Sequence, residues 1–198
     1  MISPRTAAFW LWLIWFSTWW LAAFWADRAV ARPRLSLGIL HRLLASAGFA
    51  LLFLAHFGGA AGGPISRRLI APLYPETPVV GWILVGQAAL GFGFCWWARL
   101  HLGRLWSGAT TVKADHRVID SGPYRLVRHP IYTGVIAAAA FTAAIEAGPA
   151  AMIGAGLIGL GFWMTARSEE RFLRQELGAA AYDAYARRTP MLVPGLGR

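Results

Sequence analysis

Residues 121–134, with the sequence SGPYRLVRHPIYTG, concentrate the side chains best suited to chemistry in this chain. Cationic, imidazole and phenolic groups stand directly before an almost wholly apolar run. Proline has a fixed φ and no N–H to satisfy, so Pro130 suits the first turn of a helix. Arg128, His129 and Tyr132 then lie about one turn apart at the mouth of that helix. The free N–H groups and positive dipole end of the helix predict a receptor for an anionic group on a small ligand.

The composition predicts that this helix enters a membrane. Of the 198 residues, 57% are hydrophobic and only 14% are charged, unlike an average soluble domain. The uncharged run 9–26 is nearly long enough, at about 1.5 Å per residue, to cross a hydrocarbon core of roughly 30 Å. Its six tryptophans are unlike the Leu- and Ala-rich core of a signal peptide, so we expect a retained span.

Four further apolar runs follow the first one, and turn-forming residues separate them. Gly148 and Pro149 divide the last two runs, because proline ends helices and a bilayer core needs only about 20 residues. The sequence therefore predicts an all-α, polytopic membrane protein with a single membrane domain, 1–198, and a helical tail. We expect spans at residues 9–26, 38–60, 79–98, 131–147 and 150–166.

The positions of Lys and Arg predict the orientation of these spans. With five spans, all but three of the 19 Lys and Arg residues fall on one side, the exceptions being Arg5, Arg67 and Arg68. By the positive-inside rule, the loop 99–130 and the tail 167–198 are cytoplasmic and the N-terminus lies outside. The net charge of +10 then indicates a face that contacts anionic membrane lipids, not a nucleic-acid site.

Two acidic residues, Glu169 and Glu170, emerge from the fifth span at the depth where the motif enters the fourth. Because these spans are expected to be hairpin partners, the two carboxylates face Arg128, His129 and Tyr132 across a shared pocket. Such a pocket has a cationic end for a carboxylate and an anionic end for an amine, a sulfonium or ribose hydroxyls. The alternative is an ordinary solvated helix start, in which Glu170 pairs with a later arginine such as Arg174.

The pattern G-P-Y-R-x-V-R-H-P-x-Y-x-G resembles the isoprenylcysteine carboxyl methyltransferase family of integral-membrane methyltransferases. A second element of that pattern follows the fifth span. It matches this chain at Glu169, Glu170, Leu173, Gly178, Tyr182 and Tyr185. The resemblance covers approximately residues 91–194 and implies that S-adenosylmethionine binds on the cytosolic side, between the loop 99–130 and the tail 167–198. It also implies a lipophilic substrate that enters from the bilayer.

The resemblance assigns roles to individual residues as well. It implies acceptor-holding, catalytic roles for Arg128 and Arg167. It implies cofactor-binding roles for Tyr124, Arg128, His129, Pro130, Tyr132, Gly134, Glu169 and Glu170.

The chemistry of methyl transfer agrees with these roles. Transfer from a sulfonium to a carboxylate neutralises both charges, so a dry site favours it and positioning is the main task. A carboxylate acceptor needs no general base, and Arg128 or Arg167 can hold one of its oxygens. A thiol, phenol or amine acceptor needs a base, for which His129 is the nearest candidate. The carboxylate and thiol cases both remain open.

Two other classes of protein are alternatives. A membrane reductase of the sterol-reductase type has a similar R-H-P-x-Y-x-G-like element but uses NADPH, whose 2′-phosphate needs more basic partners than this motif offers. A membrane scaffold without enzymatic activity leaves the polar cluster without a purpose. The high usage of Ala, Gly, Arg and Trp indicates a bacterial inner membrane, where a prenylated protein is an unusual acceptor.

The remaining polar residues have structural interpretations. A metal site is not expected, because His101, Asp115 and His116 lack the spacing of a defined ligand set. The single cysteine, Cys95, excludes a disulfide within the chain and is interpreted as a small core residue.

Within the spans, glycines are expected to permit packing and polar residues to find partners. Gly91 and Gly93 are interpreted as positions of close helix contact. Glu146 is expected to be an interfacial or turn-capping carboxylate at the outer end of the fourth span. His56 and Gln87 are expected to be satisfied by neighbouring helices.

Overall fold

The computed structural model describes residues 2–22, 24, 38–57, 63–75, 77–103, 119–176 and 178–196. Within these residues every regular element is helical, which confirms the all-α prediction. The elements are α1 (Pro4–Ala22), α2 (Gly38–Leu52), α3 (Leu54–Phe57), α4 (Pro64–Ile70), α5 (Pro78–Leu102), the 3-10 helix η4 (Gly122–Arg125), α6 (Pro130–Glu146), α7 (Pro149–Glu176) and α8 (Ala179–Arg188).

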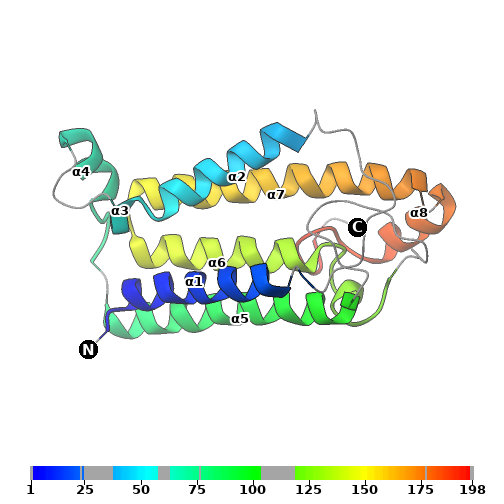
Figure 1. Ribbon diagram of the computed structural model, residues 1–198, viewed down its shortest axis with the longest axis horizontal. Coiled ribbons are helices and arrows are strands. Elements are labelled where there is room, and N and C mark those ends of the chain that lie inside the picture. Colours follow the sequence, from blue (N-terminus) through cyan, green and yellow to red (C-terminus); the bar gives the residue numbers. More distant parts are fainter. Residues whose placement is uncertain are drawn as a thin grey trace.

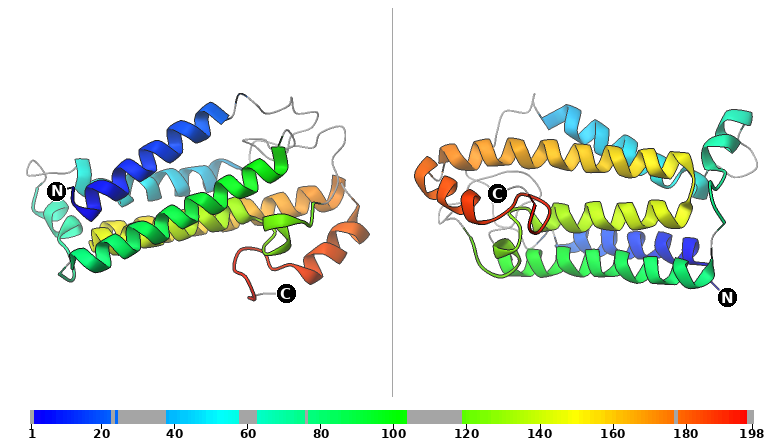
Figure 2. Two further views of the ribbon diagram at one scale, coloured as in Figure 1. Left: turned by 90° about the horizontal axis from the view of Figure 1, so that it is seen from below. Right: turned by 180° about the vertical axis from the view of Figure 1, so that it is seen from behind.

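Helix α6 lies at the centre of an elongated bundle (Figure 1). It packs against α5 on one side and α7 on the other, while α1 contacts α5 and α6, and α2 packs along α7. Both views in Figure 2 place α8 and the C-terminal segment at the same end of the bundle as η4, whereas α3 and α4 lie at the opposite end. The bundle therefore has a motif end and a far end, and α6 joins them.

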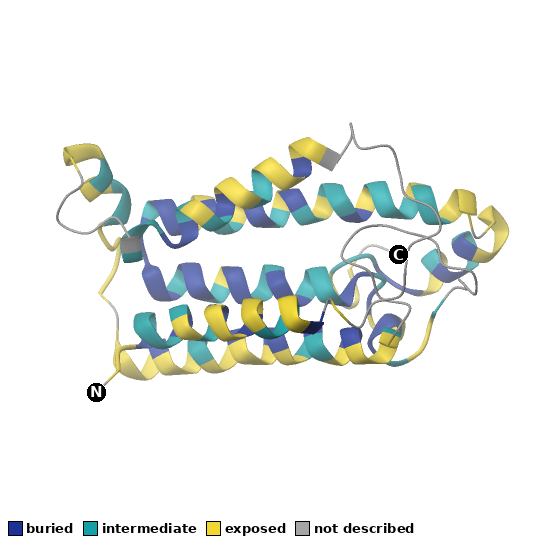
Figure 3. Ribbon diagram, viewed as in Figure 1, coloured by how far each residue is buried: buried dark blue, intermediate teal, exposed yellow. Residues whose placement is uncertain are grey.

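Two helices are long and apolar enough to cross a membrane. These are α5, with 25 residues, and α7, with 28 residues; the most apolar 18-residue stretches of the two have mean hydropathies of 1.6 and 1.4. Helix α6 and residues 39–52 of α2 form shorter apolar helices. Exposed residues line the outer faces of the bundle in Figure 3, and many are large and apolar, such as Trp82 and Leu90. An outer surface of this kind is suited to lipid.

The turn between α6 and α7 forms as Gly148 and Pro149 predict. Ala147 ends α6 in the left-handed conformation, with φ 58°, and Pro149 begins α7. From there α7 continues without a break past the fifth apolar run as far as Glu176. Glu169 and Glu170 therefore extend from the same rigid helix that packs on α6.

Glycines allow α6 and α5 to approach closely. A Cβ added to Gly134 would collide with the carbonyl oxygen of Gly91 and with Sγ of Cys95. The same is true of Gly91, whose added Cβ would come within 2.8 Å of the carbonyl oxygen of Gly134. The packing interpretation is thus confirmed for Gly91. It is wrong for Gly93, where an added Cβ would meet nothing within 4 Å among the described residues.

An aromatic core ties α1 to the rest of the bundle. Trp12 is only 1% exposed, and its ring meets that of Phe92 edge to face at 4.7 Å between centroids. Its Nε1 donates a hydrogen bond of 2.9 Å to Oγ1 of Thr142 on α6. The bond satisfies the indole N–H inside the apolar core.

One expectation about polar residues in the spans is wrong. Gln87 is exposed on the outer face of α5 and is not enclosed by neighbouring helices. Glu146 is the last residue of α6, where it is only 2% exposed and its Oε1 lies 3.5 Å from Nδ1 of His56. The same contact gives His56 the neighbour expected for it. Asp115 and His116, with the rest of segment 104–118, lie outside the described residues.

Candidate active site

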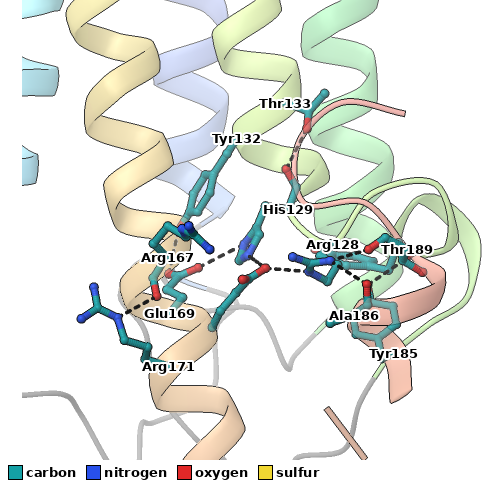
Figure 4. A network of polar contacts seen from close by, with 12 residues as sticks. Arg128, His129, Tyr132, Thr133, Arg167, Glu169, Arg171, Tyr185, Ala186 and Thr189 are labelled. Carbon is teal, nitrogen blue, oxygen red and sulfur yellow. Dashed lines mark hydrogen bonds and ion pairs between the residues drawn. The ribbon is translucent and has the colours of Figure 1, made fainter. Parts of the chain in front are cut away.

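The first turn of α6 meets the distal part of α7 in a group of charged and aromatic side chains (Figure 4). Tyr132 Oη donates a hydrogen bond of 2.6 Å to Oε1 of Glu169. The ring of His129 stacks on that of Tyr132, with 5.4 Å between centroids and 4° between planes. His129 Nδ1 lies 3.5 Å from Oε2 of Glu169, and Nε2 lies 3.4 Å from Oε1 of Glu170. One imidazole ring therefore faces two carboxylates.

Arg128 extends this group toward α8. Its Nε donates a hydrogen bond of 2.6 Å to Oε1 of Glu170. Its Nη1 donates to the carbonyl oxygens of Ala186, at 3.0 Å, and Thr189. The side chain is consequently only 9% exposed. We call Arg128, His129, Tyr132, Glu169 and Glu170 the charged cluster; the structure brings these residues together as their spacing predicts.

The alternative arrangement of Glu170 does not occur. Arg174 forms its ion pair with Asp183 of α8, with Nε to Oδ1 at 2.8 Å and Nη2 to Oδ2 at 2.9 Å. Glu170 points instead toward Arg128 and His129, where its side chain is 14% exposed. It is therefore part of a shielded group and not a solvated helix start.

Charge in the cluster is stabilised by mutual contacts. Burial alone lowers the pKa of His129, but its contacts with Glu169 and Glu170 outweigh burial and raise the pKa above its ordinary value. Burial likewise raises the pKa of Glu170, but His129 and Arg128 outweigh that effect and lower the pKa. The contacts thus favour an imidazolium beside a carboxylate.

The C-terminal segment covers the N-terminus of α6. The backbone N–H of Arg128 donates to Pro190 O at 2.9 Å, and that of His129 donates to Met191 O at 3.1 Å. Thr133 Oγ1 donates to Leu192 O at 2.6 Å. The prediction that free N–H groups here point at a ligand is therefore wrong for these two amides. The chain's own tail provides their acceptors.

The other predicted site residues lie around the cluster. Tyr124 is buried in η4, and Pro130 opens α6 as the first helical residue. Gly134 faces α5, so the structure explains it by packing. Arg167 is exposed on α7, and its guanidinium carbon lies 5.4 Å from the centroid of the Trp163 ring on the same helix. The roles of these residues in binding and catalysis remain predictions.

Helix α8 supplies contacts that the sequence analysis missed. Tyr182 and Tyr185 are each 5% exposed, and Tyr185 Oη donates to the carbonyl oxygen of Tyr124 at 2.7 Å. Burial raises the pKa of both phenols, so they remain protonated donors. The spacing of these tyrosines within the second motif was the available signal.

Arg99 was counted in the sequence only as a positive charge. It is 4% exposed and joins two helix ends, because Nη2 donates to Ala22 O at 2.9 Å and Nη1 donates to Gly103 O at 2.7 Å. No sequence signal distinguishes this arginine from its exposed neighbours.

Comparison with known proteins gives the class of the molecule. Residues 80–175 match the sequence model of the isoprenylcysteine carboxyl methyltransferase (ICMT) family. This segment runs from the start of α5 through the motif and α6 almost to the end of α7, so it contains the whole charged cluster. No curated protein was found to match the chain.

The fold and the motif therefore define an integral-membrane methyltransferase that uses S-adenosylmethionine as its methyl donor. Residues 80–175 thus carry the resemblance to the ICMT family that the motif predicts.

Proposed function

We propose that this enzyme methylates the carboxylate of a lipophilic acceptor, with S-adenosylmethionine held at the charged cluster. The observation that supports the proposal most directly is the position of His129 between Glu169 and Glu170. An ammonium and two ribose hydroxyls need acceptors and a sulfonium is favoured by nearby negative charge, while the carboxylate of the same cofactor needs a donor. The cluster offers both within one shielded group.

The buried donor set fits such a cofactor. His129 Nε2 is buried and completes no hydrogen bond of good geometry among the described residues, although it faces Glu170. A buried donor without a well-formed bond is costly, so a ligand acceptor at this position is favoured. Glu169 and Glu170 would hold cationic or hydroxyl groups, and Tyr132 would keep Glu169 oriented. When bound, the cofactor supplies an electrophilic methyl group.

The charge of His129 favours a carboxylate acceptor over a thiol. The raised pKa of His129 favours its protonated form, which is a double donor, and a protonated imidazole cannot accept a proton from a thiol or phenol. A carboxylate is already ionised and requires only positioning and exclusion of water. The residues seen here serve those two tasks.

Arg167 is the better candidate for holding the acceptor. Arg128 already donates to Glu170 and to two backbone carbonyls. Arg167 is exposed one turn before Glu170 and lies over Trp163, which is itself 42% exposed on the outer face of the bundle. A lipophilic chain lying along that apolar face would bring its carboxylate to Arg167 and the cluster.

The remaining features of the proposal concern the membrane. We place five spans in the bilayer, at 9–26, 38–60, 79–98, 131–147 and 150–166, with the charged cluster on the cytoplasmic side and the N-terminus outside. The asymmetric distribution of Lys and Arg supports this orientation. A bacterial inner membrane and an isoprenoid or fatty carboxylate are the location and acceptor that agree best with the composition.

Equilibrium binding tests where the cofactor lies. We would measure binding of S-adenosylmethionine, S-adenosylhomocysteine and NADPH to the detergent-purified protein and to its His129→Ala and Glu170→Ala variants. Glu176→Ala is a matched control, because Glu176 is exposed on the same helix. We expect both adenosyl compounds to bind, and the two cluster variants alone to bind weakly. Unchanged affinity in both cluster variants would place the cofactor elsewhere, and binding of NADPH alone would support the reductase.

Methyl transfer tests the acceptor. Candidate acceptors are a prenylated cysteine, an isoprenoid acid, a fatty acid and a lipophilic thiol. We expect methyl esters from the carboxylates, and Arg167→Gln to raise the KM of the acceptor while leaving cofactor affinity unchanged. A thioether as the only product would show that the acceptor is a thiol.

A further inference from the structure

The C-terminus of α8 is held by a side chain from the motif. The last carbonyl groups of a helix have no partner within it, and a cation near them is favourable. Arg128 Nη1 donates to two such oxygens, those of Ala186 and Thr189, while Nε of the same guanidinium donates to Glu170. One planar group thus connects α8 to the carboxylate of α7.

The chain after α8 returns along the first turn of α6. Pro190 and Met191 accept from the backbone N–H groups of Arg128 and His129, and Leu192 accepts from Thr133 Oγ1. Within α8 itself, Tyr185 Oη donates to the carbonyl oxygen of Tyr124. Figure 4 shows the segment passing beside the motif. We call residues 179–192 the C-terminal clasp.

We propose that Arg128 is a positioning residue through which the C-terminal clasp sets Glu170 for cofactor binding. The clasp lies beyond the segment 80–175 that matches the family model, although its Tyr182 and Tyr185 belong to the second element of the sequence resemblance. Its contacts with Arg128 are made by backbone oxygens, so they depend on where the clasp lies and not on its side chains. This inference rests on the proposed placement of the cofactor at the charged cluster.

The donors of Arg128 separate this role from a catalytic one. A guanidinium that holds an acceptor carboxylate needs donors directed at that acceptor. Here Nε and Nη1 are directed at Glu170, Ala186 and Thr189. A change in Arg128 should therefore alter the affinity for the cofactor through Glu170, and it should leave the affinity for the acceptor unchanged.

A matched pair of threonine variants tests the clasp without changing a side chain of the charged cluster. Thr133 Oγ1 donates to His129 O and to Leu192 O, whereas Thr165 Oγ1 donates only to the preceding turn of its own helix, at Gly161 O. We expect Thr133→Val to weaken S-adenosylhomocysteine binding by about fivefold, the usual effect of one lost hydrogen bond. Thr165→Val should bind as wild type does. Neither variant should change the KM of the acceptor.

Arg128→Lys tests the proposed positioning role of Arg128 directly. Lysine keeps the charge but cannot reach Glu170 and two carbonyls with one planar fork. We expect S-adenosylhomocysteine to bind about tenfold more weakly. In a plot of this affinity against pH, the fall on the acid side should also move to higher pH, because Glu170 loses a partner that lowers its pKa. The double variant with Thr133→Val should lose less affinity than the product of the two single fold losses.

The outcomes separate this inference from the proposed function. A fall in kcat for Arg128→Lys, with unchanged cofactor affinity and no shift of its fall on the acid side, would assign Arg128 to the acceptor and overturn the clasp. Equal binding by Thr133→Val and Thr165→Val would also overturn it. If Thr133→Val does not fold, Tyr185→Phe removes another contact of the clasp and should likewise weaken cofactor binding. If His129→Ala binds the cofactor normally, the placement of the cofactor itself fails.

Discussion

Helix α6 carries a contact between histidine and glutamate at each of its ends, and the surroundings of the two contacts differ. At the far end His56 faces the single carboxylate of Glu146, and Phe9 stacks on the imidazole at 4.4 Å between centroids. At the motif end His129 faces both Glu169 and Glu170. The far end thus sets its imidazole between an aromatic ring and one carboxylate, with Arg5 nearby, whereas the motif end sets its imidazole against two carboxylates.

The backbone of α6 shows the same difference. At the far end its final carbonyls are satisfied from two other segments: Tyr74 Oη donates to Ala144 O at 2.7 Å, Arg5 Nη2 donates to Glu146 O at 3.2 Å, and Leu73 N donates to Ala147 O at 2.8 Å. These bonds fix the helix end without forming a receptor. The comparison agrees with the proposal that the motif end of α6 binds the cofactor, while the far end serves stability.

Glu170→Gln should cause the largest loss of function at the motif end, measured as affinity for the cofactor. The change keeps the size of the side chain but removes the charge that faces Arg128 and His129. We expect cofactor affinity to fall by about 100-fold, because two buried charged groups lose their partner. Isothermal titration with S-adenosylhomocysteine measures the loss. A variant that binds within twofold of wild type would contradict the assignment of Glu170.

Gly134→Ala should damage packing and not binding. An added methyl group would collide with backbone of α5 at Gly91 and with Cys95, so we expect a loss of about 2 kcal/mol in the free energy of unfolding. Gly93→Ala is the control, since its added methyl group meets nothing nearby. Thermal unfolding in detergent measures both variants. Weak cofactor binding by a Gly134→Ala protein of normal stability would restore its predicted role in the cofactor site.

Glu146→Gln should affect only the far end. The amide can still contact His56, so we expect a loss of about 1 kcal/mol in stability. Because the charged cluster lies at the opposite end of α6, the affinity for S-adenosylhomocysteine should remain unchanged. Thermal unfolding and titration of the same sample check both statements. A large loss of affinity would show that the two ends are coupled.

A pH series should show the smallest effect, one of about a few tenths of a kcal/mol per pH unit near neutrality. The raised pKa of His129 gives a stabilising contribution that is complete below 6.5 and is lost as pH rises through the raised value. The lowered pKa of Glu170 gives one that is complete above 4.5 and is lost as pH falls through the lowered value.

The pKa shifts of His129 and Glu170 together determine how stability depends on pH. The stability difference between wild type and His129→Gln should be largest between pH 4.5 and 6.5 and smaller on the alkaline side. Thermal midpoints of the two proteins across the pH range measure this difference. A difference that does not change with pH would show that His129 is not ionised in the folded protein.

The sequence predicted the charged cluster because local rules were sufficient. Pro130 marks the start of one helix, and Gly148 with Pro149 marks a tight turn. Two helices joined by a tight turn return to the same depth, which places Glu169 and Glu170 opposite the motif.

The clasp could not be predicted in that way. Arg128 meets backbone oxygens of Ala186 and Thr189, and any residue type can supply a backbone oxygen. Gly134 was assigned from resemblance, and its packing partner, Gly91, is visible only when α5 and α6 are placed side by side. Gln87 was expected to need a partner, but its position on α5 faces outward.

Helix α7 runs without a break from Pro149 to Glu176, so a small tilt at one end displaces the other end by a larger distance. Glu170 lies about 32 Å along this helix from Pro149, at 1.5 Å per residue, so a tilt of about 3° about the turn moves its backbone by about 1.6 Å. Shifts of this size are enough to disturb a reacting geometry. Any change in the tilt of α7 within the bilayer would therefore act mechanically on the carboxylates at its other end.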